Sequence, residues 1–195
     1  MGERTGDFPT EVFAMILAII CPLNIAPEQR AWIESVRALH DPQHHEVEAH
    51  FTLVFPTDKV SLVGTSEHAE EVARRMSSIS FRLADVRAVR DHDASRSHVF
   101  LTPDQGDSEI RALHDALYVG ELSSSLRADI SYVPHVTVAS FAEHSAAEKL
   151  CDAIGRIEIP GYLHALDIMS VDDRRIRLER SIALGVAQHD RQPLA

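Results

Sequence analysis

Two short stretches of this sequence repeat one pattern, and the fold is inferred from them. HFTLVF occupies residues 50–55, and HVTVAS occupies residues 135–140. Each has a histidine, an apolar residue, a threonine and another apolar residue, and each is expected to form a strand that a turn and a helix follow. The repetition suggests a chain made of two related halves.

Strand geometry determines which side chains of the first stretch lie together, because side chains two residues apart point to the same face of a strand. His50 and Thr52 are therefore expected on one face, with Phe51, Leu53 and Phe55 on the other. One imidazole and one hydroxyl would be open to a ligand, and the apolar side chains would anchor the strand.

The second stretch presents its side chains in the same way. His135 and Thr137 share one face, and Val136 and Val138 lie opposite. Phe141 has the parity of His135, so it is a candidate for bordering the site and stacking on a base, with packing in the core as the alternative. If a pseudo-twofold axis relates the halves, both His/Thr pairs meet at one shared cleft.

The rest of the chain alternates between strand and helix periodicity. We expect Thr65 and Ser66 to cap the second helix and Gly120 to end the third. Helices are predicted over 26–41, 65–78, 107–120 and 143–155, strands over 12–23, 47–55, 79–89, 97–103 and 135–141, and a closing hairpin over 162–185 that turns at Asp172 and Asp173.

The length and composition are those of one globular domain. With 195 residues, 45% hydrophobic and 25% charged, the chain is expected to form a single bilobal domain over residues 1–185. Residues 186–195 are expected to be a disordered tail.

Charge and hydropathy exclude some classes of partner. The apolar run over 12–23 is shorter than the ~20 residues of a membrane helix, so no membrane partner is expected. Cys21 and Cys151 stand singly in apolar stretches, which suggests reduced thiols and a cytoplasmic protein. The net charge of −11 argues against binding extended nucleic acid but allows a small phosphate ester.

Two imidazoles and two hydroxyls suit phosphodiester chemistry. Histidine has an ordinary pKa of about 6.5, so one ring can accept a proton from the nucleophile while another gives one to the leaving oxygen. The threonine hydroxyls can donate hydrogen bonds to the non-bridging phosphate oxygens, where charge develops. This chemistry needs no metal ion.

The two motifs resemble those of a known family. HFTL at 50–53 and YVPHVTVA at 132–139 are similar to the twin His-x-Thr/Ser signatures of the 2H (two-histidine) phosphoesterase superfamily, which includes bacterial 2′-5′ RNA ligase-like and cyclic phosphodiesterase proteins. The resemblance runs over about residues 12–185, and two such motifs in strand context are far more specific than one.

The resemblance implies an α+β fold with two pseudo-symmetric lobes, antiparallel sheets around a central cleft and helices outside. It implies that His50 and His135 are the acid and base and that Thr52 and Thr137 bind the substrate phosphate. Tyr132 matches the aromatic residue before the second motif and is a candidate for lining the cleft. The implied substrate is a small nucleotide or an RNA-terminal cyclic phosphate, without cofactor or metal, and we expect a monomer.

Several alternatives remain open from the sequence. Either histidine can be the base, and Glu48, which shares the parity of His50, either orients that ring or lies at a solvated strand end. The cluster HHEVEAH over 44–50 allows a metal-dependent hydrolase, although its spacing fits no zinc motif. A nucleotide-binding module of the same fold without turnover is the third possibility.

Overall fold

The computed structural model describes residues 15–92, 95–172 and 175–185 of the chain. Its strands are β1 (Ile16–Pro22), β2 (Asn24–Ile25), β3 (His50–Thr57), β4 (Ile79–Arg90), β5 (Ser97–Gln105), β6 (Val136–Phe141), β7 (Ile159–Leu163), β8 (Ala165–Val171) and β9 (Ile176–Ala183). Its helices are α1 (Pro27–His40), α2 (Leu62–Arg75), α3 (Asp107–Leu117) and α4 (His144–Ile154), and η1 is a 3-10 helix over Gly120–Ser125.

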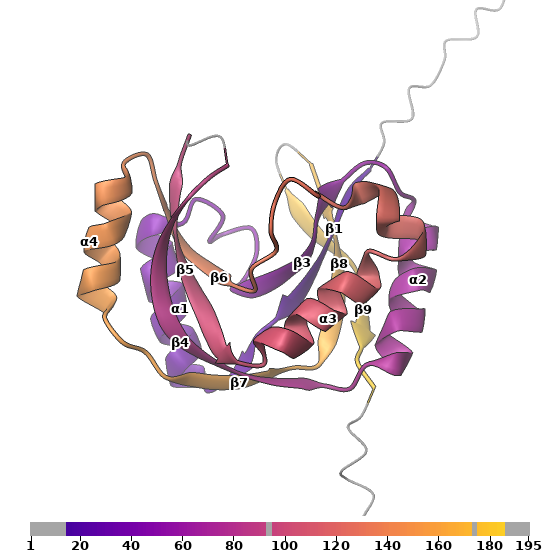
Figure 1. Ribbon diagram of the computed structural model, residues 1–195, viewed down its shortest axis with the longest axis horizontal. Helices are drawn as coiled ribbons and strands as arrows, with labels where there is room; N and C mark the ends of the chain where they lie inside the picture. The colour runs from indigo at the N-terminus through magenta and orange to yellow at the C-terminus, as the bar shows by residue number, and fades with distance from the viewer. Residues whose placement is uncertain (1–14, 93–94, 173–174, 186–195) are drawn as a thin grey trace, which may run out of the picture.

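The strands form two sheets, and the pairings within both are antiparallel. The four-stranded sheet has the order β3-β1-β8-β9, and the five-stranded sheet has the order β2-β7-β4-β5-β6. Figure 1 shows the two sheets as diverging arms. The strands that carry the two motifs, β3 and β6, are edge strands of different sheets and contact each other.

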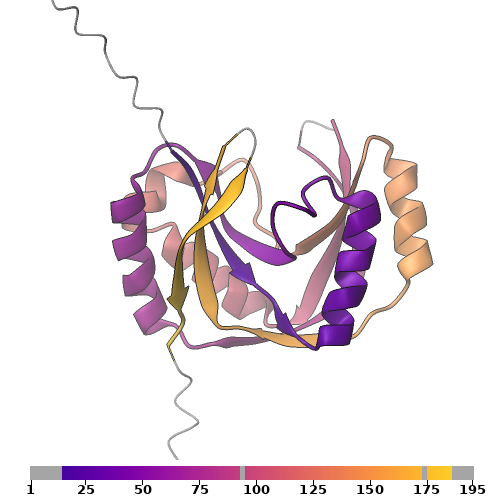
Figure 2. The same ribbon diagram turned by 180° about the vertical axis from the view of Figure 1, so that it is seen from behind.

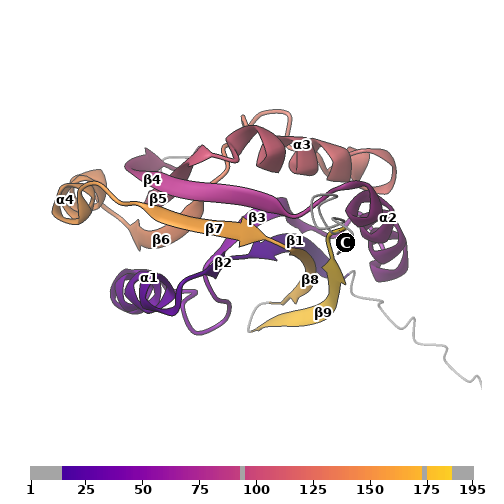
Figure 3. The ribbon, with the colours of Figure 1, turned by 90° about the horizontal axis from the view of Figure 1, so that it is seen from below.

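The helices lie outside the sheets, as the resemblance implied. α1 packs on β6, α4 packs on β4 and β5, and α2 packs on β8 and β9. Figure 2 shows α1 and α4 beside one arm and α2 beside the other. In the view from below, α1 and α3 lie on opposite sides of the sheets (Figure 3). The α+β class with antiparallel sheets and outer helices is therefore confirmed.

The apolar run at the start of the chain forms the centre of the four-stranded sheet. Residues 17–21 are all buried because β1 pairs with β3 on one side and β8 on the other, with side chains covered on both faces. Cys21 is a buried free thiol that donates to the Ala165 carbonyl at 2.8 Å, and Cys151 is free and half-buried. Residues 12–14 of the predicted strand lie outside the described residues.

Each motif strand contains an irregularity just after its threonine. Thr52 pairs with Ile20 and Val54 with Ile19, so Leu53 is an extra residue in β3. In β6, Thr137 pairs with Phe100 and Ala139 with Val99, so Val138 is the extra residue. Both positions are β-bulges, and a bulge reverses the alternation of side chains beyond it.

The bulges have the same effect in both halves. Leu53 and Val54 are consecutive buried residues in β3, and Val138 and Ala139 are their counterparts in β6. The residues that follow the buried pairs, Phe55 and Ser140, are only half-buried, so the predicted placement of Phe55 on the back of β3 is wrong. The two halves therefore share a β-bulge as well as the His-x-Thr pattern, although regular strand alternation does not predict the bulge.

Two predicted helix boundaries are wrong. α2 begins at Leu62, and Ser61 is its cap, because the Ser61 side chain accepts from the Gly64 N–H at 3.1 Å. Thr65 and Ser66, the predicted caps, lie buried within the helix. α3 ends at Leu117, whereas Gly120, with φ of 67°, begins η1.

The chain ends and turns are only partly described. Residues 186–195 and Asp173 lie outside the described residues, so the tail and the full hairpin turn stay predictions, as does the division into one domain. Within the described residues, no helix is long and apolar enough to cross a membrane.

Candidate active site

The two motif histidines have the same hydrogen-bonding arrangement. Nδ1 of His50 lies 2.7 Å from the carbonyl oxygen of Glu48, and Nδ1 of His135 lies 2.6 Å from that of Val133. Each ring therefore binds the carbonyl two residues before it. Because a carbonyl only accepts, Nδ1 must carry the hydrogen, and Nε2 is the nitrogen left for a ligand in both rings.

Glu48 supports His50 through its backbone. Its carboxylate pairs with Arg30 at 3.2 Å, and the side chain is 76% exposed. The charge of Glu48 therefore faces solvent, and the orientation of the His50 ring depends on the carbonyl of that residue.

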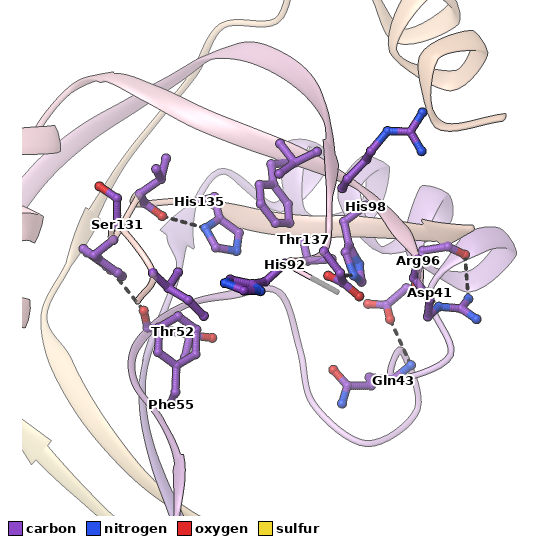
Figure 4. Close-up of a pocket in the computed structure, with 18 of the residues that line it drawn as sticks. Asp41, Gln43, Thr52, Phe55, His92, Arg96, His98, Ser131, His135 and Thr137 are labelled. Atoms are coloured by element: carbon purple, nitrogen blue, oxygen red, sulfur yellow. Dashed lines mark hydrogen bonds and ion pairs between the residues drawn. The ribbon is translucent and has the colours of Figure 1, made fainter. Parts of the chain in front are cut away.

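One pocket brings most of the predicted site residues together. It has a volume of about 730 Å³, and His135, Thr137, Thr52 and Tyr132 are among the residues that line it. Figure 4 shows the His135 ring turned into this pocket beside Thr52 and Thr137. His50 is not among the described lining residues. It begins β3 two residues before Thr52, close enough that its charge acts on His135.

The bulges change which further side chains reach the pocket. Phe55, which parity placed on the back of β3, lines the pocket, and so does Ser140 of β6. Phe141 is not among the described lining residues and takes the alternative that the sequence left open, packing against the core. Its ring centroid lies 5.4 Å from that of His40 in α1.

Tyr132 links the two sheets at the site. Its hydroxyl donates to the Thr52 carbonyl at 3.0 Å, and its ring stacks on His114 with centroids 3.7 Å apart. The Tyr118 hydroxyl accepts from the Phe55 N–H at 3.0 Å. These tyrosines satisfy two backbone groups at the free edge of β3. Tyr132 thus lines the pocket, as predicted, and also positions the strand that carries His50.

The environment of the pocket disfavours charged imidazoles. Burial lowers the pKa of His135 from its ordinary 6.5 to about 4, and it also lowers the pKa of His50. In His135, the bond to the Val133 carbonyl opposes this effect, and the charges of His50 and His98 add to it. Without a ligand, both rings are therefore neutral near pH 7.

Sequence reasoning missed the aromatic stack beside His135. The Phe100 ring lies on the His135 ring with centroids 3.7 Å apart, and His98 stacks on Phe100 at 5.9 Å. Both residues come from β5, which pairs with β6. The alternation in 97–103 places His98 and Phe100 on one face, and this was the available signal.

A buried ion network holds the segment that leads into His50. Arg37, 2% exposed, donates through Nε to Asp41 at 2.9 Å, through Nη1 to Glu34 at 3.0 Å and through Nη2 to the Val47 carbonyl at 2.8 Å. Glu34 also accepts from the Ala49 N–H at 2.8 Å. α1 therefore positions residues 41–49, and with them the start of β3.

The cluster over 44–50 does not converge on a metal site. His44 lies 3.7 Å from the Glu34 carboxylate and packs edge-on against His45, with ring centroids 4.7 Å apart. Within residues 15–92, 95–172 and 175–185, no group of three or more His, Cys, Asp or Glu side chains is placed to hold a metal ion.

Comparisons with known proteins agree with this fold. E. coli LigT complexed with 3′-AMP is 19% identical, with a TM-score of 0.54, over 87% of this chain and 98% of that chain. Kluyveromyces marxianus Usb1 with uridine monophosphate is 11% identical, also with a TM-score of 0.54 and the same coverages. A search of curated protein sequences found no match.

A match to a sequence family shows which family the chain belongs to, whereas similarity to these solved structures shows only the fold. The model of the 2′-5′ RNA ligase superfamily matches residues 25–175, which include both motifs and the helices between them. From this match, we conclude that the chain belongs to the 2′-5′ RNA ligase superfamily of 2H phosphoesterases.

Proposed function

We propose that this protein is a metal-independent phosphodiesterase that hydrolyses a 2′,3′-cyclic phosphate or a 2′-5′ phosphodiester of a nucleotide or an RNA end. The observation that carries the proposal is the repeated histidine geometry. His50 and His135 each bind a carbonyl through Nδ1, which leaves two Nε2 atoms for one substrate. Two rings held in the same tautomer suit a proton transfer at each side of a phosphorus atom.

In the proposed reaction, one neutral imidazole takes a proton from water as its oxygen attacks phosphorus. The other imidazole, protonated, gives its proton to the ribose oxygen as the P–O bond breaks. A 2′,3′-cyclic phosphate then yields a 2′-phosphate and a free 3′-hydroxyl. Thr52 and Thr137 donate hydrogen bonds to the non-bridging oxygens, where negative charge increases in the transition state.

The size of the pocket and the solved relatives support a small nucleotide as substrate. A volume of about 730 Å³ accommodates a nucleotide, and the apolar side chains of Phe55, Ile130 and Val133 in its lining offer surface to a base or ribose. LigT is known with 3′-AMP and Usb1 with uridine monophosphate. By analogy, we propose a nucleotide ligand for this chain.

The first experiment measures turnover of a panel in the presence of a chelator. The panel contains the four nucleoside 2′,3′-cyclic phosphates, an ADP-ribose cyclic phosphate and a 2′-5′ dinucleotide. We expect chelator-resistant hydrolysis of at least one member. Loss of activity on chelation would indicate a metal-dependent hydrolase instead. Binding with recovery of unchanged ligand would indicate a nucleotide-binding module.

The pH dependence of the reaction follows from the lowered pKa values of both histidines. The productive enzyme has one protonated and one neutral ring, and both pKa values lie below 6.5 in the free protein. We therefore expect kcat/KM to fall by up to about tenfold per pH unit as pH rises above 6.5, because the acid loses its proton.

The kcat profile should lie at higher pH than the kcat/KM profile. A bound phosphate anion raises the pKa of the imidazole that it touches, so the enzyme–substrate complex keeps its proton longer. Steady-state kinetics between pH 4 and 9 measure both profiles. A kcat/KM that is constant or increases from pH 6 to 8 would contradict this assignment of the acid.

A further inference from the structure

The end of the pocket away from His135 carries positive charge that the proposed reaction does not use. Figure 4 shows His135 and Thr52 on one side of the pocket and Arg96 and Asp41 on the other. Arg90 also lines the pocket. It lies in β4 opposite Ser97, the residue after Arg96, so both arginines belong to the same end of the β4–β5 pair.

Most other arginines are neutralised by a carboxylate. In the part of the chain that the structure describes, eight form such ion pairs: Arg30, Arg37, Arg75, Arg82, Arg87, Arg111, Arg127 and Arg180. Arg90 and Arg96 have no carboxylate partner among the described residues. In a chain with a net charge of −11, two such cations on the lining of one pocket favour an anionic ligand there.

Arg96 is held in place by a neutral residue. Its Nε donates to the Ser140 hydroxyl at 2.7 Å, and its Nη2 donates to the Ser140 carbonyl at 3.2 Å. Ser140 belongs to β6, the strand of Thr137. These bonds orient the guanidinium without cancelling its charge, which leaves Nη1 and the full positive charge for a ligand.

The acidic side chains at this end already have partners. Asp41 accepts from Arg37 at 2.9 Å, and Asp91 lies 2.8 Å from Nε2 of His98. Neither carboxylate is paired with Arg96 or Arg90. Both guanidinium groups are therefore without an ion pair among the described residues, although Asp41 and Asp91 line the same pocket.

The spacing along the sheet fits one nucleotide. Thr137 is opposite Phe100, and Ser140 is opposite His98, two residues away along β5. This separation is about 7 Å at the rise of a β-strand. In a nucleoside, the ribose ring and one methylene group separate a 2′,3′-cyclic phosphate from a phosphate on the 5′ oxygen, which is a separation of similar size.

We propose that Arg96, assisted by Arg90, binds a second phosphate on the 5′ oxygen of the nucleoside whose cyclic phosphate lies at the two histidines. This proposal rests on the proposed function and narrows its substrate class. The preferred substrates are 5′-phosphorylated nucleoside 2′,3′-cyclic phosphates. The 5′ phosphate is either a monoester of a single nucleotide or the diester that joins the last nucleotide of an RNA to its neighbour.

The test compares two substrates that differ only in the 5′ phosphate. Adenosine 2′,3′-cyclic phosphate and its 5′-phosphorylated form are assayed with wild type, Arg96→Gln and the control Arg75→Gln, which changes an exposed arginine paired with Glu71 on α2. We expect the 5′ phosphate to lower KM roughly tenfold in wild type and control, through charge-assisted hydrogen bonds. Arg96→Gln should lose this gain and keep its activity on the substrate without a 5′ phosphate.

Two results would overturn the proposed subsite. One is an equal KM for both substrates in wild type, and the other is an equal increase in KM for both substrates in Arg96→Gln. The cyclic phosphate of an adenylyl-adenosine dinucleotide distinguishes the sources of the phosphate. A gain with it assigns RNA ends, and a gain confined to the monoester assigns single nucleotides.

Failure of the proposed function would be seen separately. If wild type hydrolyses neither adenosine substrate, the same pair is titrated by calorimetry against wild type and Arg96→Gln. A roughly tenfold tighter Kd for the 5′-phosphorylated form, lost in Arg96→Gln, supports the subsite without turnover. Equal Kd values would refute it.

Discussion

Replacing either His50 or His135 by alanine should reduce kcat by about 100- to 10,000-fold, the range for loss of a general acid or base. KM should change little, because in the proposed reaction Thr52 and Thr137, which line the pocket, hold the phosphate. The measurement is steady-state hydrolysis of the best substrate in the presence of chelator. Retention of most activity in either variant would refute the two-histidine mechanism.

A matched histidine and the fold itself serve as controls. His164 is exposed and is not among the described residues that line the pocket, so His164→Ala should keep full activity. Thermal unfolding shows whether His135→Ala remains folded.

The stability of His135→Ala should depend on pH differently from that of wild type. Folding lowers the pKa of His135 from 6.5 to about 4, so the unfolded chain binds more protons between these pH values. Wild type therefore loses stability as pH falls through them. The variant lacks this loss, so its Tm relative to wild type should be higher at pH 5 than at pH 7.5.

Replacing Arg37 by leucine should lower the free energy of unfolding by about 3–5 kcal/mol, the cost of removing one partner from a buried ion pair. Arg37 is 2% exposed, and its loss would leave the Asp41 and Glu34 carboxylates without their cation and the Val47 carbonyl without its donor. Urea unfolding measures the change.

The control for Arg37 is an exposed pair of the same type. Arg75 pairs with Glu71 in α2 and is 74% exposed, so Arg75→Leu should change stability little. A loss of under about 1 kcal/mol in Arg37→Leu would show that the network does not behave as a buried ion pair. If Arg37→Leu folds too weakly to measure, Arg37→Lys, which keeps the charge but not the guanidinium geometry, should show a smaller loss of the same sign.

The sequence predicted the two motif strands because their signal is local. His50, Thr52, His135 and Thr137 stand at fixed spacing in apolar runs, and a strand period places each pair on one face. The prediction failed for Phe55, since alternation assumes a regular strand. The consecutive apolar residues after each threonine were the sign of a bulge, but they read equally well as a strand buried on both faces.

Other features depend on contacts between separate segments of the chain, so the pattern of one segment does not predict them. Ser61 caps α2 without the glutamate of a capping box, whereas Thr65 and Ser66, which the sequence suggested as the cap, are packed residues of the helix. The short strand β2 and its partner β7 are recognised only as a pair. Likewise, Phe100 and Arg96 lie at the site because β5 pairs with β6, and the sequence pattern does not predict which strands pair.

The bulges also have a consequence for the direction of the reaction. The two imidazoles make the same hydrogen bond to the backbone, so that bond does not set the order of proton transfer, and the order must come from residues at which the halves differ. Five positions after each histidine, the bulges turn Phe55 and Ser140 into the pocket, one an aromatic wall and the other the anchor of Arg96. We expect a nucleotide bound between such unlike walls to lie in one orientation. In the proposed reaction, the specificity residues therefore decide which histidine meets the entering water and which meets the departing oxygen.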